Sequence, residues 1–403
     1  MKLTKKIAAF AVAAVTAILC AVTNVGAEGY SEDDDYSSDT DEYITSGDYQ
    51  YSVRQDEDGN DVAFLEKYTG SDTEIDIPET IDDYKVIGLG DGTFYENKKI
   101  TEVTLSKNLT DFGIAPFYGC TSIMEFKVDE DNELYTTDSD GAVVHKGGLA
   151  ILAYPTGKNP EKYTVADGVS IINASTFAMC TNLKELVLPD SLKYVGYYAF
   201  AECTSLETVV LPDNITEISN YMFSGCTSLR NVTLPKNLQK IGDAAFFNCK
   251  SLDVIDFPST LSEIGQASFC STGFTSITIP ATISTIGYSA FGFHTDDTDQ
   301  IVADENFVIM GYSGSYAQTY SRENSIEFVA LDEEEKASEQ AQQEAKEKTN
   351  SRGKITGICV GVGICFTVAI ILTIIAVPGR KKKKAEENGE NNSDNDESTE
   401  EKE

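Results

Sequence analysis

The sequence contains no tryptophan and only two histidines, His145 and His294, among its 403 residues. Metal centres and acid–base sites that depend on histidine therefore have almost no candidates. Basic residues are also scarce, because 31 lysines and arginines stand against 66 aspartates and glutamates, which gives a net charge of −35. An acidic field of this size repels the phosphate backbone of nucleic acids. The composition argues against nucleic-acid binding and gives catalysis little support.

Both ends of the chain carry features of export to a membrane. Residues 1–27 combine a lysine-rich start, an apolar stretch and small residues up to Ala27, which is typical of a signal peptide. Residues 355–377 contain no charged side chain. As a helix they would be about 35 Å long at about 1.5 Å per residue, the thickness of a bilayer core. A basic run follows directly, which favours a cytoplasmic tail over residues 378–403, first basic and then acidic. We expect a single-pass protein of the cell membrane with an extracellular N-terminal ectodomain.

A 23-residue repeat dominates the middle of the chain. The segments that begin at Leu183, Leu206 and Leu229 share the pattern LxxLxLPxxLxxIGxxAFxxCxS. One phenylalanine marks each unit, at Phe94, Phe117, Phe177, Phe200, Phe223, Phe246, Phe269 and Phe291. A unit this short cannot bury its apolar side chains alone, so successive units must stack as a solenoid with a phenylalanine-filled core. Alternating apolar residues predict one short strand per unit and a parallel strand ladder. The glycine of the IG pair is expected to permit a tight turn.

The repeat also sets the expected division of the chain. One phenylalanine interval is 60 residues long, which predicts an inserted β-hairpin at about residues 128–165. The fold class that follows is a β-rich solenoid with one hairpin insert and one C-terminal transmembrane helix. The expected segments are a signal peptide (1–27), an acidic disordered leader (28–48), the solenoid (49–331) with a C-terminal capping unit at about 300–331, a charged, helix-prone stalk (332–354), the membrane span (355–377) and the cytoplasmic tail (378–403).

Cysteines recur with the repeat. Cys180, Cys203, Cys226 and Cys249 are each 23 residues apart, and Cys120 and Cys270 also lie in the predicted solenoid. Equal spacing places the four at one position of successive units, where they are expected to be small, reduced core residues. The alternative is oxidation between adjacent rungs, since a separation of about 5 Å is within disulfide range.

Metal-binding and catalytic motifs are weak. Asp56, Asp58 and Asn60 alternate as in a calcium loop, but Asp61 occupies the position that needs glycine. Other aspartate clusters, near Asp138 and Asp296, are interpreted as solvated loops. No serine or cysteine of the nucleophile-elbow type accompanies either histidine. We therefore assign no catalytic residue, no metal ligand and no cofactor.

The outward side of the strand ladder is the candidate partner-binding surface. Residues between the inward-pointing pairs face solvent together, and solenoids use such continuous surfaces to bind partners. We call this surface the ladder face. It comprises Glu102, Thr104, Glu125, Lys127, Glu185, Val187, Thr208, Val210, Asn231, Thr233, Val254, Asp256, Ser276 and Thr278.

The chain resembles the BspA-like leucine-rich repeat family from about residue 49 to residue 331. The resemblance rests on LxxLxLPxxLxxIGxxAFxxC, on DGAVV and LAYPTGK in the insert, and on GYSGSYAQTY followed by IEFVAL. It implies a secreted or surface-exposed protein, as many bacterial members are, and a role in adhesion to matrix proteins or cells, as in some members.

Three functions remain open. The first is non-catalytic recognition of an extracellular protein or cell-surface glycan by a membrane-anchored bacterial surface protein. The second is an extracellular enzyme, or an enzyme accessory subunit, acting on a surface polymer. The third is a structural component of the envelope. The sequence leaves the partner's identity and the oligomeric state undetermined.

Overall fold

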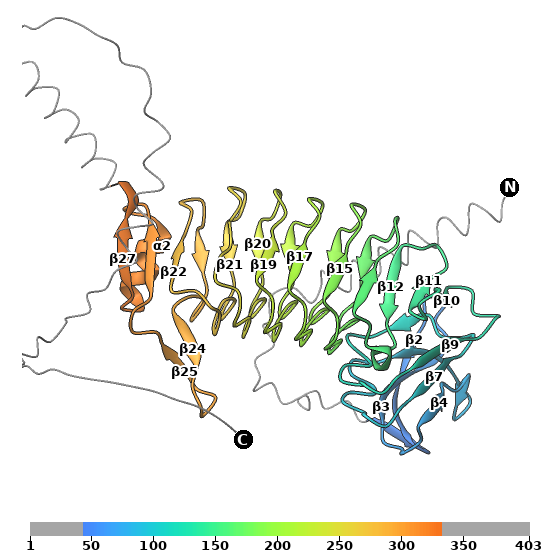
Figure 1. The fold of residues 1–403 in the computed structure, drawn as a ribbon. Helices are drawn as coiled ribbons and strands as arrows, with labels where there is room; N and C mark the ends of the chain where they lie inside the picture. Colours follow the sequence, from blue (N-terminus) through green and yellow to red (C-terminus); the bar gives the residue numbers. More distant parts are fainter. Residues whose placement is uncertain (1–42, 333–403) are drawn as a thin grey trace, which may run out of the picture. The chain divides into compact units, whose positions relative to one another are not determined.

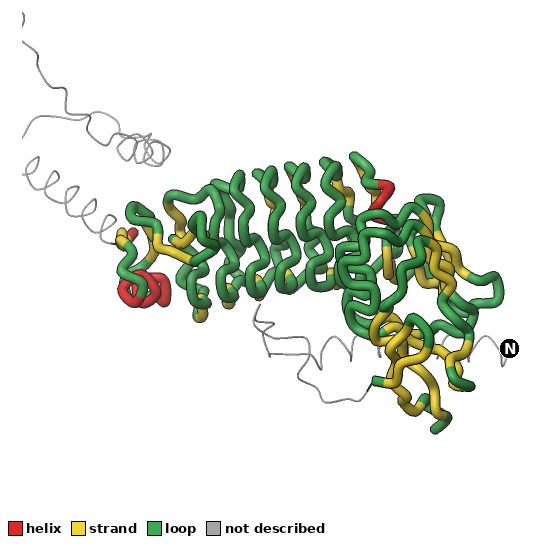
Figure 2. The backbone as a smooth tube through the Cα atoms, turned by 90° about the horizontal axis from the view of Figure 1, so that it is seen from below, coloured by secondary structure: helices red, strands yellow, loops and turns green. Residues whose placement is uncertain are grey.

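The computed structural model describes residues 43–332, which form a β-solenoid (Figure 1). Each regular turn contains two short strands and a corner around the repeated phenylalanine. Loops and turns make up most of each coil (Figure 2). Among the described residues, helix is limited to α2 (Tyr316–Glu323) and the short 3-10 helix η1 (Thr156–Lys158).

The first strand of each turn builds the ladder that the sequence predicts. Its strands pair in parallel, as in the register of Thr208 with Asn231 and of Val210 with Thr233. The ladder consists of three sheets in chain order. These are β4 (Glu74–Asp76), β7 (Glu102–Leu105) and β9 (Glu125–Val128); then β13 (Lys162–Thr164), β15 (Glu185–Val187), β17 (Thr208–Val210) and β19 (Asn231–Thr233); then β22 (Ser276–Thr278), β26 (Val308–Gly311) and β27 (Glu327–Ala330).

The second strand of each turn is only two residues long in the regular units. These strands also pair in parallel, as in Ile218 with Ile241. They form one sheet of β18 (Glu217–Ile218), β20 (Lys240–Ile241), β21 (Glu263–Ile264) and β23 (Thr285–Ile286), and they extend another through β14 (Ile171–Ile172) and β16 (Tyr194–Val195).

The insert contains the predicted β-hairpin and adds a third antiparallel strand to it. β10 (Tyr135–Thr137), β11 (Val143–His145) and β12 (Ala150–Ala153) pair antiparallel in sequence. β12 then pairs in parallel with β14 and so takes the place of a second strand in the stack.

The N-terminal boundary of ordered structure differs from the prediction. The leader was expected to extend to residue 48, yet β1 (Ile44–Ser46) pairs with β2 (Tyr49–Gln55), which pairs with β3 (Asp61–Tyr68). β3 continues into a sheet with β6 (Tyr84–Leu89), which also pairs with β5 (Thr80–Ile81) and β8 (Asp111–Phe112). High charge did not prevent folding here because the apolar residues of β2 and β3 alternate inward against the first turn.

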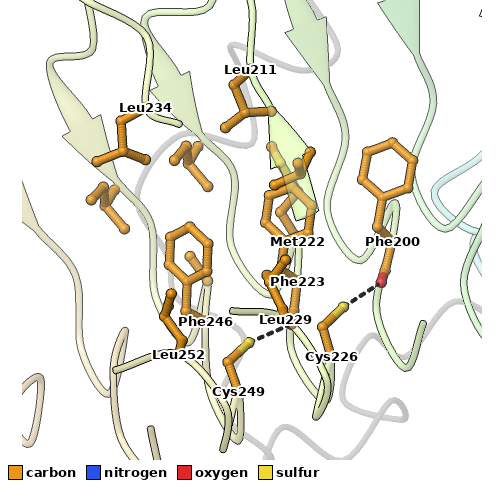
Figure 3. Packing of buried hydrophobic residues seen from close by; sticks show 14 of the residues in the cluster. Phe200, Leu211, Met222, Phe223, Cys226, Leu229, Leu234, Phe246, Cys249 and Leu252 are labelled. Carbon is orange, nitrogen blue, oxygen red and sulfur yellow. Dashed lines mark hydrogen bonds between the residues drawn. The ribbon is translucent and has the colours of Figure 1, made fainter. Parts of the chain in front are cut away.

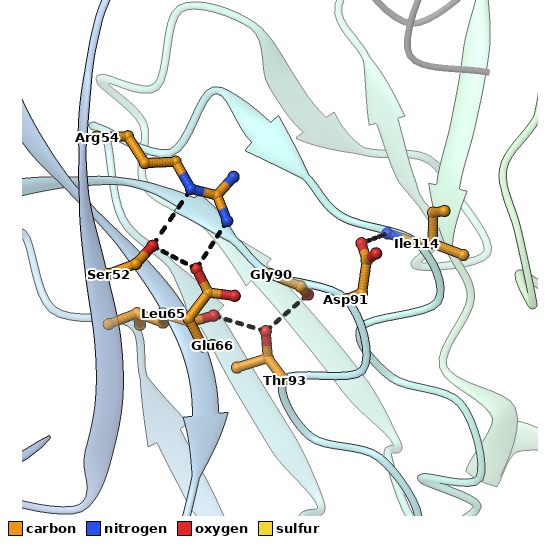
Figure 4. A network of polar contacts seen from close by, with 8 residues as sticks. All are labelled: Ser52, Arg54, Leu65, Glu66, Gly90, Asp91, Thr93 and Ile114. Atoms are coloured by element: carbon orange, nitrogen blue, oxygen red, sulfur yellow. Dashed lines mark hydrogen bonds and ion pairs between the residues drawn. The ribbon is translucent and has the colours of Figure 1, made fainter. Parts of the chain in front are cut away.

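A polar network fixes these strands (Figure 4). Arg54 Nη2 lies 2.8 Å from Glu66 Oε1, and Ser52 Oγ donates to the same carboxylate. The Arg54 guanidinium also lies 4.2 Å from the centre of the Phe64 ring. In the next turn the Thr93 hydroxyl contacts the carbonyls of Leu65 and Gly90, at 2.8 and 2.9 Å. The strands therefore cover the end of the core.

Stacked phenylalanines fill the solenoid, as the repeat predicts (Figure 3). From Phe177 to Phe291 each ring stacks on the next with centroids 5.0–5.7 Å apart and planes within 13°. Phe117 is the exception, since it is only half-buried. It stacks on Phe94 at 5.2 Å but not on Phe177. The core accordingly consists of two clusters of buried residues, one on each side of the insert.

The cysteine ladder is reduced and buried. All six cysteines among the described residues are free thiols. Cys226 Sγ donates to the carbonyl of Phe200 at 3.2 Å, and Cys249 Sγ donates to that of Phe223 at 3.1 Å (Figure 3). Cys120 Sγ donates in the same way to the carbonyl of Phe94, and Cys203 Sγ donates to that of Phe177, each in the preceding turn. Four of the six thiols thus link neighbouring turns by a hydrogen bond in place of a disulfide.

The glycine of the IG pair was expected to permit a tight turn, but in the structure it permits close packing between successive turns. A Cβ on Gly196 would lie 2.4 Å from the Ala174 backbone nitrogen, and one on Gly287 would lie 2.3 Å from the Gln266 nitrogen. These glycines allow one turn to approach the next closely. The left-handed conformations of the corners fall on other residues, such as Tyr198 (φ 57°) and Glu202 (φ 58°).

The C-terminal unit closes the stack with a hairpin, a helix and two strands. β24 (Phe293–Thr295) and β25 (Ile301–Ala303) pair antiparallel, and β26, α2 and β27 form the capping unit that the sequence places at about residues 300–331. Within residues 43–332 no helix has the length and apolar character to cross a membrane. The expected signal peptide, stalk, span and tail lie outside the described residues.

Candidate binding surface

The ladder face points to solvent as predicted. Eleven of its fourteen residues are exposed, and Glu102, Thr104 and Ser276 are half-buried. The residues between them point inward, such as Leu186 and Val209 in β15 and β17. Alternation along each strand therefore separates core from surface, as the period of two requires.

The ladder beneath this surface is interrupted twice, whereas the sequence predicts a continuous row. β9 does not pair with β13, because the insert comes between them in the chain. No strand is assigned to residues 254–256, so the sheet ending at β19 is separate from the sheet beginning at β22. Val254 and Asp256 are nevertheless exposed and Ile255 is buried, so the inward–outward alternation continues through this turn.

Charges on the ladder face are paired toward its N-terminal part. Lys127 forms an ion pair with Glu102, and Lys162 Nζ lies 2.7 Å from Glu185 Oε1. These pairs are exposed, so each contributes little to stability. Their effect is to reduce the negative charge that this part of the surface presents.

The middle of the ladder face is uncharged. We call it the neutral centre, and it comprises Val187, Thr208, Val210, Asn231, Thr233 and Val254. Its valines are unusually accessible for aliphatic side chains, with exposed fractions of 39% at Val187, 58% at Val210 and 60% at Val254. A neutral, partly apolar patch stands out on a chain with a net charge of −35.

The aspartates considered as metal ligands accept hydrogen bonds from amides of their own loops. The Asn60 side-chain amide donates to both oxygens of Asp56, and the backbone amides of Asp58 and Asn60 donate to Oδ1, at 3.0 and 2.8 Å. The side-chain bond first, and then the backbone bonds, hold the pKa of the exposed Asp56 carboxyl below its usual value. Asp138 and Asp296 accept from amides of their own loops in the same way. Across residues 43–332 no group of three or more His, Cys, Asp or Glu side chains is placed to hold a metal ion.

The two histidines lie far apart in the fold. His145 is in β11 of the insert, where burial lowers its pKa. His294 is in β24, and its Nδ1 lies 2.6 Å from Asp304 Oδ1. Neither histidine has a hydrogen bond to a serine or cysteine among the described contacts, and burial raises the pKa of the Cys120 and Cys180 thiols to about 12. These thiols are therefore poor nucleophiles.

A ladder of tyrosines on the corners was not foreseen. Tyr95 stacks on Tyr118 at 5.4 Å, Tyr118 meets Tyr198 edge to face at 5.6 Å, and Tyr198 stacks on Tyr221 at 4.6 Å. Tyr95 and Tyr118 follow their phenylalanine by one residue, whereas Tyr198 and Tyr221 precede theirs by two. Because these are different repeat positions, a search for one recurring column misses the contact.

Comparison with known proteins identifies the repeat. The model of the BspA type leucine rich repeat region matches six copies over residues 63–139 and 160–298, more than half of the chain. No curated protein matches.

Several solved bacterial structures are similar. A leucine rich cell surface protein of Faecalibacterium prausnitzii shares 25% identity, with 66% of this chain and 59% of that chain covered and a TM-score of 0.34. A leucine-rich repeat protein of Bacteroides ovatus shares 23% identity, covering 71% and 66%, with a TM-score of 0.39. The pneumococcal vaccine antigen PcpA shares 16% identity, covering 72% and 98%, with a TM-score of 0.38. On the strength of the family match, the chain belongs to the BspA-type leucine-rich repeat family.

Proposed function

We propose that the chain is a bacterial surface protein that binds an extracellular protein or cell-surface glycan, without catalysis, through the ladder face. The neutral centre is the observation that carries the proposal. Cores of protein interfaces are depleted of charge, and an accessible apolar cluster with a polar surround is typical of a contact surface. Val187, Val210 and Val254 supply the accessible apolar side chains, and Thr208, Asn231 and Thr233 supply hydrogen-bonding groups between them.

The division of the chain supports display at a membrane. A signal peptide at 1–27, a stalk at 332–354 and a span at 355–377 would present the solenoid outside the cell, with residues 378–403 in the cytoplasm. The same arrangement also suits a structural envelope component. Recognition is the better supported function, because the neutral centre offers an accessible contact surface on the ladder face.

The test is a binding screen of the full chain on arrays of matrix proteins, cell-surface glycans and polysaccharides. Each hit is measured again with Val210→Glu and Val254→Glu, which place a charge in the neutral centre. The matched control is Ile301→Glu in β25, where the same change is made at a side chain that is 41% exposed.

We expect a saturable hit that the two ladder-face variants weaken at least tenfold and the control leaves unchanged. Equal binding by all variants would overturn the role of the ladder face. Hydrolysis of an arrayed polymer would favour the enzymatic alternative, and self-association in place of any hit would favour the structural one.

A further inference from the structure

A two-stranded hairpin projects from the last corner of the solenoid (Figure 1). β24 and β25 pair antiparallel and join no further strand of the described chain, so they form a small sheet of their own. A sheet of two strands is only marginally stable in water and gains stability from a third strand or a packed neighbour. The hairpin contains no residue of the ladder face, so it is a separate surface.

The inner edge of the hairpin is tied to the solenoid through β24. The Phe293 carbonyl accepts from the Ser271 amide at 2.8 Å, and the Thr295 amide donates to Ser271 Oγ, also at 2.8 Å. The backbone groups of Phe293 and Thr295 on this side are therefore used. Because the direction of these groups alternates along a strand, those of His294 point to β25.

The outer edge of the hairpin is open. The Asp304 amide donates to the Gly292 carbonyl at 2.8 Å, so Asp304 faces the β24 side. By the same alternation Val302 also faces β24, whereas the amides and carbonyls of Ile301 and Ala303 point away from it. Among the described residues these outward groups have no hydrogen-bond partner.

The open edge matches an extended backbone. Each outward residue offers one amide and one carbonyl, which is the mixed pattern that one edge of a β-strand presents to its neighbour. An added strand can therefore pair with both residues, as when a peptide adds to the edge of a sheet. No cavity has to open for this contact, because Ile301 is 41% exposed and Ala303 is exposed beside it.

Acidic side chains stand at both ends of this edge. Asp297 and Asp299 lie in the hairpin loop, and Asp304 and Glu305 directly follow β25. Among the described residues no lysine or arginine forms an ion pair with any of these four, and the Asp304 carboxylate contacts the His294 ring at 2.6 Å. A strand with basic side chains on both sides of an apolar centre complements this charge.

A second copy of the chain fits this edge less well than a basic strand does. Charged side chains at an edge discourage pairing between like edges. Two copies joined antiparallel through β25 would bring the acids at its two ends together, and like charges repel. The charge of the edge therefore favours a different polypeptide.

We propose that the outer edge of β25 binds an extended basic segment of another polypeptide by strand addition. Backbone hydrogen bonds to Ile301 and Ala303 set the register of the added strand. Its apolar centre packs beside the exposed Ile301 side chain, and lysines or arginines toward its ends pair with the acids that flank β25. This inference does not rest on the function proposed for the ladder face.

The edge can be blocked without removing the pairing of β24 with β25. Ala303→Pro deletes an outward amide, and proline is tolerated in edge strands where the amide faces solvent. The charge is tested by Asp299→Asn combined with Glu305→Gln. Asp299 has a φ of 59°, which asparagine accepts. The matched control is Glu323→Gln in α2 combined with Glu327→Gln in β27, which removes the same charge from other elements of the C-terminal unit.

The probe is a display library of random ten-residue peptides panned on the full chain. Enriched peptides should carry lysine or arginine on both sides of an apolar centre. One of them is synthesised, and its dissociation constant is measured by calorimetry. We expect Ala303→Pro and the Asp299/Glu305 double variant to weaken binding at least tenfold, and the control double variant and Val210→Glu to leave it unchanged.

Several outcomes of this screen would overturn the proposal. They are failure to enrich any peptide, enrichment of acidic peptides, and equal binding by the Ala303→Pro variant. Loss of binding in Val210→Glu alone would assign the peptide to the ladder face instead. An intact edge and a failed ladder face are therefore distinguishable, as is the reverse.

N-methylation of the peptide tests the backbone pairing itself. In an added strand alternate amides face β25, and the others face solvent. Two versions of the peptide are methylated at one or the other alternate set of amides. One version should lose at least tenfold in affinity, and the other should bind as the unmodified peptide does. Equal effects of the two sets would refute strand addition even if the charge dependence held.

Hydrogen exchange on the unmodified chain gives a test that depends on no variant. In the free chain the amides of Ile301 and Ala303 should exchange much faster than that of Val302, which faces β24. The selected peptide should slow both at least tenfold. Full protection of these amides without peptide would mean that the edge is already covered, and it would refute the proposal. Protection that increases with the concentration of the chain would assign the edge to a second copy.

Discussion

Replacing Phe223 by alanine should destabilise the solenoid strongly. Phe223 is fully buried and stacks between Phe200 at 5.6 Å and Phe246 at 5.5 Å. Truncation of a buried phenylalanine costs about 3–5 kcal/mol, and each aromatic contact adds about 0.5–1.5 kcal/mol beyond buried area. With two stacking partners lost, we expect a fall of about 4 kcal/mol or more in the free energy of unfolding.

Phe117→Ala is the matched control for this prediction. Phe117 is half-buried and stacks on one ring of the column, Phe94, because the insert interrupts the stack on its other side. It also meets Phe126 edge to face at 5.1 Å, so its lower burial is the main reason for a smaller loss. Its truncation should cost about half as much, roughly 2 kcal/mol. Both variants are measured on the full chain by urea unfolding followed with far-ultraviolet circular dichroism. Equal losses at the two positions would refute the argument that stacking on both sides, and the interruption at the insert, set the local stability.

Three further predictions follow from buried groups and close contacts. The six described cysteines should resist alkylation at pH 8, because burial raises the pKa of each thiol; they are Cys120, Cys180, Cys203, Cys226, Cys249 and Cys270. Peptide mass spectrometry should find them modified only after the chain unfolds in urea. Modification of these thiols in the native chain would contradict the reduced, buried ladder. Burial raises the pKa of the Glu202 carboxyl, because the folded protein disfavours its ionised form. Ionised Glu202 therefore lowers the free energy of unfolding at pH values above its folded-state pKa. This loss disappears below the unfolded-state pKa, where the carboxyl is protonated in both states. Glu202→Gln should therefore raise the unfolding free energy at pH 7 by less than about 1 kcal/mol, since the side chain is partly solvated, and should have no effect near pH 3; a gain at pH 3 that disappears at pH 7 would reverse the sign. Gly242→Ala should cost about 1–3 kcal/mol in urea unfolding, because the new Cβ would lie 2.7 Å from the Asn220 backbone nitrogen, whereas a neutral outcome would mean that the turns can separate freely.

The repeat pattern was sufficient to predict much of the fold. Phenylalanine, cysteine and the apolar strand residues occupy the same place in each unit, so one alignment assigned Phe200, Phe223, Phe246 and Cys226 to the core. The hairpin insert was also recognisable, because it lengthens one interval between phenylalanines and carries its own strand and turn residues. The outward orientation of the ladder face followed from the period of two.

The remaining features depend on neighbours that the pattern does not specify. Phe117 has the sequence of a core residue, but the insert follows it in place of a regular turn, so the ring is half-buried. Residues 254–256 keep the strand pattern without a strand assignment. Composition alone argues against folding of the acidic segment near Ile44. The segment folds because β2 pairs with it. Each difference arises where a segment's environment departs from that of its equivalents in other units.

Radical footprinting of the full chain, with and without the partner identified by the array, shows whether the ladder face is the contact surface. We expect Val187, Val210 and Val254 to lose reactivity on binding, while Tyr288, which is 66% exposed and lies outside the ladder face, keeps its reactivity. Protection of Tyr288 with unchanged valines would contradict recognition through the ladder face.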